Sequence, residues 1–155
     1  MIYSFIVTSN QKNFIREYHV PAEYSLYDFR RFIENDLEVD DSQQVVFFIL
    51  DEQENKKESY SLFNMDTVIL EDLKNSEKLV KMLYTFDVFN DRSLTIMFQE
   101  EVEPQPRVSY PIVYMSKGDN PNQFNEKPVE DEFPDISNEN DYEEEDLLDL
   151  KTDTL

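Results

Sequence analysis

The segment Lys81–Glu100, KMLYTFDVFNDRSLTIMFQE, constrains the fold most, because it contains the longest alternation of apolar and polar residues in the chain. In an extended strand, successive side chains point to opposite faces of a sheet. Two sets of alternate residues share the apolar face of this pattern: Met82, Tyr84, Phe86 and Val88, then Leu94, Ile96 and Phe98. The segment therefore predicts two amphipathic strands that pair as an antiparallel hairpin.

The connection within this hairpin, Phe89–Arg92, contains Asn and Asp, which tolerate the positive φ of turns, but it lacks the Gly that the tightest turns prefer. We therefore predict a loop of roughly four residues. The polar residues at the hairpin tip form a weak candidate site for a cation or for a partner's basic group: Asp87, Asn90, Asp91 and Arg92. Turn chemistry alone also explains Asn and Asp at these positions.

The N-terminal third predicts a second hairpin followed by the main helix. Ile2–Thr8 and Phe14–Val20 are short runs of strand formers, and Pro21 ends the second run. Ser25, with Asp28 three residues later, has the pattern of a helix N-cap with an acidic first turn. A helix over about residues 26–35 lays one set of residues on the sheet: Leu26, Phe29, Ile33 and Leu37. We expect Arg30 and Arg31 on its solvated face.

Four further segments complete the predicted fold. Gln44–Leu50 contains the run VVFFIL, which indicates a strand buried on both faces. Ser59–Phe63 predicts a short strand, Leu70–Leu73 one helical turn, and Tyr110–Met115 a last edge strand. The sequence thus predicts an α+β domain over residues 1–121, with a curved, mixed or largely antiparallel sheet built from hairpins and one main helix packed on it.

Charge sets the C-terminal segment apart. The chain has 35 acidic and 14 basic residues, a formal net charge of -21. Residues 126–155 alone carry 13 acidic and two basic residues, with few apolar residues between them. Such a segment cannot bury enough apolar surface to offset its conformational entropy, so we predict a disordered acidic tail over residues 122–155.

Leucines among acids near the end of this tail resemble disordered segments that fold against basic, apolar grooves. The candidate partner-binding residues are Tyr142, Glu143, Glu144, Glu145, Asp146, Leu147, Leu148 and Leu150. A solubilising tail with incidental leucines is the alternative, and the sequence leaves the two open.

Composition also narrows the class of function. The chain has no cysteine and one glycine, which excludes thiolate sites and Gly-rich phosphate loops. His19 is the single histidine, and we expect it to be packed or hydrogen-bonded rather than catalytic or metal-binding. We find no catalytic constellation, no cofactor motif, no signal peptide and no membrane span. We expect a cytoplasmic protein that avoids nucleic acid and membranes and binds a basic protein.

Three segments carry a family resemblance: VPAEYSLYDFRRFIENDLEVDD at residues 20–41, LYTFDVFNDRSLTIMFQE at residues 83–100, and YPIVYMSKGDNPNQ at residues 110–123. Their order resembles the plasmid pRiA-type ORF-three-like family, whose members are often labelled transposon-passenger or resolvase-like proteins. The resemblance covers about residues 1–123 and implies an α+β domain with a curved sheet, but no settled activity. The five scattered arginines do not form the phosphate-holding site that a serine recombinase needs.

These observations favour a non-catalytic interaction or adaptor protein, with the acidic tail as a candidate recognition segment. One alternative is an acidic DNA mimic that inhibits a nucleic-acid-binding protein, whose binding would survive removal of the tail. A second is a mobile-element-associated protein of unknown activity.

Overall fold

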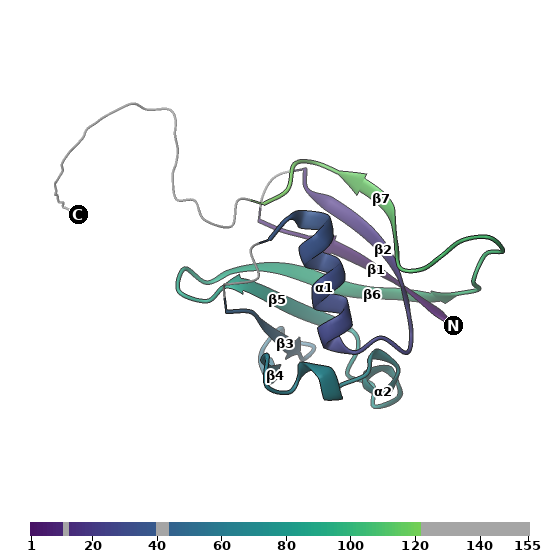
Figure 1. Cartoon of the computed structure of the whole chain (residues 1–155). Coiled ribbons are helices and arrows are strands. Elements are labelled where there is room, and N and C mark those ends of the chain that lie inside the picture. The colour runs from purple at the N-terminus through teal and green to yellow at the C-terminus, as the bar shows by residue number, and fades with distance from the viewer. Residues whose placement is uncertain (11–12, 40–43, 122–155) are drawn as a thin grey trace, which may run out of the picture. The chain divides into compact units, whose positions relative to one another are not determined.

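The computed structural model describes residues 1–10, 13–39 and 44–121, which all belong to one compact unit. Within them, Figure 1 shows a seven-stranded sheet with one main helix lying across it. No helix in these ranges is long and apolar enough to span a bilayer. The elements are β1 (Ile2–Thr8), β2 (Ile15–Pro21), α1 (Leu26–Leu37), β3 (Val46–Leu50), β4 (Lys56–Tyr60), the short 3-10 helix η1 (Met65–Thr67), α2 (Leu70–Asn75), β5 (Lys81–Asp87), β6 (Arg92–Val102) and β7 (Ile112–Lys117).

All strand pairs are antiparallel, in the order β4-β3-β5-β6-β1-β2-β7. Both predicted hairpins are confirmed, since β1 pairs with β2 and β5 with β6. The second hairpin is connected by residues 88–91, a loop of the predicted length. The predicted last edge strand is also present, at Ile112–Lys117 rather than Tyr110–Met115, and as β7 it forms one edge of the sheet beside β2. These pairings give the curved antiparallel sheet of an α+β domain.

The core lies between α1 and the inner face of the sheet. Phe29 of α1 is fully buried, with its ring centroid 5.0 Å from that of Phe5 on β1 and 6.2 Å from that of Phe47 on β3. Ile33, one turn further along, is also fully buried. The predicted spacing of apolar residues on the helix is therefore confirmed, and the helix joins strands from both halves of the sheet.

The start of α1 is fixed by a capping box, as its sequence predicts. The Asp28 amide donates to Ser25 Oγ at 3.0 Å, and the Ser25 amide donates to Asp28 Oδ2 at 3.1 Å. The helix continues to Leu37, two residues beyond the prediction, and ends at Glu38 with a left-handed φ of 58°. Because Leu37 is only 3% exposed, burial of its side chain explains the extra half-turn.

The solvated position predicted for Arg30 is wrong. Arg30 is 5% exposed and its Nε lies 2.5 Å from Oε2 of Glu34, itself 7% exposed. Pairing at a spacing of four residues neutralises both charges, which allows the two side chains to be buried together. Burial, followed by the nearby Glu34 charge, raises the pKa of Tyr84 beside this pair. Arg31 is exposed, as expected.

Three strand predictions need correction. Val46 and Phe48 of β3 are only half-buried, so this strand is not buried on both faces; α1 covers the inner face alone. The predicted strand at Ser59–Phe63 instead occupies Lys56–Tyr60, because pairing with β3 begins inside the charged segment. Val88 does not continue β5; it lies in the turn and is 41% exposed.

Arg16 fixes the end of β7 to β2. Its Nη1 donates to the carbonyl of Lys117 at 2.8 Å, and its Nη2 donates to the carbonyl of Gly118 at 3.0 Å and to Asn120 Oδ1 at 2.7 Å. Gly118 has a φ of 87°, and a Cβ there would lie 2.3 Å from the carbonyl oxygen of Asn13. The close approach of two backbones explains why the single glycine occurs at this position.

Replacing Ser25 with Ala removes the N-cap hydrogen bond of α1. We expect the free energy of unfolding to fall by about 1 kcal/mol, measured as a lower midpoint of urea unfolding. Ser116→Ala, an exposed position on β7, is the control and should change stability by less than about 0.5 kcal/mol. Equal effects of the two substitutions would show that the cap contributes nothing.

Candidate functional site

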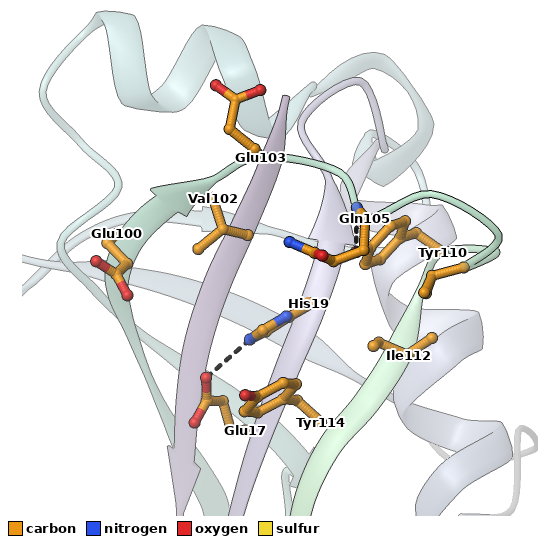
Figure 2. A pocket seen from close by; sticks show the side chains of 10 residues that line it. Glu17, His19, Glu100, Val102, Glu103, Gln105, Tyr110, Ile112 and Tyr114 are labelled. Atoms are coloured by element: carbon orange, nitrogen blue, oxygen red, sulfur yellow. Dashed lines mark hydrogen bonds and ion pairs between the residues drawn. The ribbon is translucent and has the colours of Figure 1, made fainter.

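A cleft of about 340 Å³ opens on the face of the sheet opposite α1. On β2, Tyr18 packs against Phe32 of α1, so its neighbours Glu17 and His19 point to the other face. Figure 2 shows side chains from β2, β6, β7 and the β6–β7 connection gathered around this space. We call it the outer-face cleft, and its polar and aromatic lining is Glu17, His19, Glu100, Glu103, Tyr110 and Tyr114.

The floor of the cleft is built on one cross-strand row. In the register of the sheet, Glu100 of β6 lies opposite Ser4 of β1, Ser4 lies opposite His19 of β2, and His19 lies opposite Ile112 of β7. Cross-strand neighbours in such a row are close enough for their side chains to interact. Residues nearly a hundred positions apart in the sequence are thereby brought to one site.

Hydrogen bonds and stacking hold the floor in place. His19 Nε2 lies 2.8 Å from Glu17 Oε2, and the Ser4 hydroxyl lies 3.2 Å from the same oxygen and 2.7 Å from Gln99 Oε1. The His19 ring stacks on Tyr114, with centroids 4.3 Å apart and planes 13° apart. His19 is 8% exposed, so the prediction of a packed, hydrogen-bonded histidine is confirmed.

The β6–β7 connection forms one wall. The Gln105 amide donates to the Tyr110 hydroxyl at 3.0 Å, and the Val108 amide donates to the Gln105 carbonyl at 3.3 Å. These bonds fold the connection back on itself beside the floor (Figure 2). Glu100 and Glu103 are exposed at the rim, and Tyr114, whose ring stacks on His19, is also exposed, at 63% of the residue's surface.

This arrangement suits a cationic ligand better than it suits a serine nucleophile. Carboxylates beside aromatic rings attract Lys and Arg side chains. In a hydrolase relay the imidazole lies between the hydroxyl and the carboxylate. Here the Glu17 carboxylate lies between Ser4 and His19, and Ser4 is fully buried. Within the described ranges, no group of three or more His, Asp or Glu side chains is placed to hold a metal ion.

At the predicted hairpin tip, the structure brings Asp87, Asn90 and Arg92 together. Asp87 is 7% exposed, and its carboxylate accepts hydrogen bonds from the Asn90 amide and side chain and from Arg92. The fourth residue, Asp91, adopts a left-handed φ of 52° in the turn. Hydrogen bonds from the Asn90 side chain, the Asn90 amide and Arg92 lower the pKa of Asp87, and the Asn90 side chain makes the largest contribution. Partner binding at this tip stays a prediction.

The tail candidates lie outside the described residues, so their role also stays a prediction: Tyr142, Glu143, Glu144, Glu145, Asp146, Leu147, Leu148 and Leu150.

The outer-face cleft was not predicted. Glu17 and His19 share one strand face in the sequence pattern, which is a local signal. The other lining residues come from β6, β7 and their connection, and only the pairing of distant strands brings them alongside.

The fold and the cleft define a small α+β domain with a hollowed, acidic sheet face. The chain belongs to the plasmid pRiA4b ORF-3-like protein family, whose profile matches residues 5–152. The resemblance seen in the sequence is therefore confirmed. The match also runs past residue 123, where the resemblance was placed to end, so it includes most of the acidic segment.

The fold is shared with a solved structure. The crystal structure of MM3350, a protein of unknown function from Methanosarcina mazei Go1, aligns with a TM-score of 0.67 over 77% of this chain and 70% of that chain. At 17% sequence identity this likeness concerns the fold alone. No curated protein matches the sequence.

Replacing Asp87 with Asn tests the hydrogen bonds of the hairpin tip. Because the folded-state pKa of Asp87 is lowered from 3.8, its ionised form stabilises the fold above that value, and this contribution is lost as pH falls through the folded pKa. We expect Asp87→Asn to lower the free energy of unfolding at neutral pH and to have a smaller effect once the pH has fallen through the folded-state pKa of Asp87, below 3.8.

Urea unfolding of both proteins at the two pH values measures this difference. The exposed position Asp66 provides the control, and Asp66→Asn should have a small effect at both. A destabilisation by Asp87→Asn that does not change with pH would contradict the expected role of the carboxylate.

Proposed function

We propose that this protein is a non-catalytic interaction or adaptor protein of the cytoplasm that binds a basic protein partner. The observation that carries the proposal is the outer-face cleft, which is lined by the exposed residues Glu100, Glu103 and Tyr114. A formal net charge of -21 supports it, because long-range attraction accelerates encounters with a basic surface.

Two surfaces contribute to recognition in this proposal. The cleft receives basic side chains on the folded domain, and the acidic segment with Leu147, Leu148 and Leu150 adds a second contact. Linking two modest contacts on one chain raises the overall affinity above that of either alone. Removal of one contact should therefore weaken capture, and removal of both should abolish it.

The paired substitution Glu100→Gln and Glu103→Gln tests the cleft, because it removes two rim charges while preserving side-chain size. Each partly screened charge contributes about 0.5 kcal/mol, so capture of a basic partner should weaken roughly fivefold. The tagged full-length chain is the bait in host-cell lysate, and quantitative mass spectrometry measures the captured proteins at two salt concentrations.

The matched control is Glu52→Gln with Glu77→Gln, which removes the same number of charges at exposed positions away from the cleft. The control should capture the same proteins as the unaltered chain, apart from a small loss due to net charge. If both double variants lost captured partner equally, capture would depend on net charge alone, which would contradict a role for the cleft in recognition.

Deletion of residues 125–155 tests the tail. We expect the remaining chain to keep its urea midpoint, and to capture the same partner about tenfold less well. Capture that is unchanged by deletion would contradict a recognition role for the tail. If that capture also depends strongly on salt and the partner binds nucleic acid, the result favours the DNA-mimic alternative.

A further inference from the structure

The edge of the sheet at β7 offers a way for the partner to reach the outer-face cleft. Among the described residues, β7 pairs with β2 and with no other strand, so one side of its backbone is not part of a ladder. Unpaired edge groups can bind a further extended strand. β7 is half-buried or exposed along its length, which leaves this edge accessible.

The two edges of the sheet differ in where their charges lie. The opposite edge, β4, carries the adjacent exposed residues Lys56 and Lys57, followed by Glu58, and lysines on an edge strand discourage further pairing. β7 has one lysine, at its last residue, and lies beside the carboxylates of the cleft. These carboxylates would attract a basic segment to the β7 edge.

Strand geometry connects the β7 edge to the cleft. Ile112 and Tyr114 of β7 line the cleft, and Ile112 ends the cross-strand row that runs through His19, Ser4 and Glu100. A strand added beside β7 would extend this row by one position. Every second side chain of that strand would then stand on the outer face beside the cleft.

Hydrogen bonds to β2 fix the C-terminal end of β7 in an extended conformation. Three hydrogen bonds from Arg16 fix Lys117, Gly118 and Asn120 to β2 before any partner binds. The Tyr114 ring is held against His19 with near-parallel planes. Because the backbone and the ring are ordered in advance, this side of the interface would lose less conformational entropy when a partner strand docks.

The lining of the cleft favours arginine over lysine. A guanidinium group is planar, stacks on aromatic faces and can form two parallel hydrogen bonds with one carboxylate. Tyr114 supplies an aromatic ring, and Glu17, Glu100 and Glu103 are the carboxylates of the same cleft; Figure 2 shows Glu17 next to Tyr114, with Glu100 and Glu103 farther along the cleft. A lysine ammonium would gain the charge attraction but not the planar contacts.

We infer that an extended basic segment of a partner protein adds to β7 as an eighth strand and places an arginine side chain in the outer-face cleft. This inference rests on the proposed function and names the way in which the folded domain recognises its partner.

A library of random twelve-residue peptides displayed on phage tests the inference, with the immobilised full-length chain as the target. We expect the selected peptides to share an arginine flanked by β-branched residues at alternate positions. In fluorescence anisotropy, replacing that arginine with lysine should weaken binding of the synthetic peptide about tenfold. The protein variant Glu100→Gln with Glu103→Gln should weaken it, whereas Glu52→Gln with Glu77→Gln should not.

Methylation of single backbone nitrogens in the same peptide tests strand pairing. Alternate amides of an edge strand face its neighbour. Methylation at every second residue should therefore abolish binding, and methylation at the residues between them should leave binding nearly unchanged. Effects without this alternation, an absence of selected peptides, or selected peptides without arginine would each overturn the inference. The lysate experiment with the cleft variants still decides the proposed function, since a partner can bind the cleft without pairing with β7.

Discussion

The packing of α1 against one face of the sheet is the interaction on which the rest of the structure depends. Phe29 contacts Phe5 on one side and Phe47 on the other, and so joins the N-terminal hairpin to the strand that follows the helix. Covering one face leaves the other to solvent, where Phe48 and Leu83 are half-buried and Met97 is 44% exposed. The one-sided core thus creates the outer face on which the cleft forms.

Several buried or half-buried charged groups within and beside the core are arranged in pairs or small networks. Arg30 and Glu34 neutralise each other beneath the helix, and Arg16 satisfies carbonyls at the end of β7 while its Nε lies 3.6 Å from Asp36 Oδ2. On the outer face, the Glu17 carboxylate contacts both Ser4 and His19. Such pairing allows charged side chains to be buried, and it fixes the positions of the groups that line the cleft.

Local sequence patterns predict most of the fold. The alternation in Lys81–Glu100, the capping box at Ser25 and the apolar spacing of α1 each depend on residues close in sequence, and each is confirmed. The patterns fail for one ion pair within the helix and for one strand whose partner is set by the sheet. Arg30 is buried because Glu34 neutralises its charge, and β4 begins at Lys56 because β3 supplies its hydrogen bonds.

The sequence by itself determined the α+β class, the two hairpins, the family and the concentration of negative charge near the C-terminus. The tertiary structure alone decided the cleft, because Glu17, Glu100 and Tyr114 come from three strands whose neighbours are set by long-range pairing. A strand's own sequence specifies which residues share a face, but not which strand lies beside it. For that reason the acidic, aromatic surface became visible only once β6, β1, β2 and β7 were placed side by side.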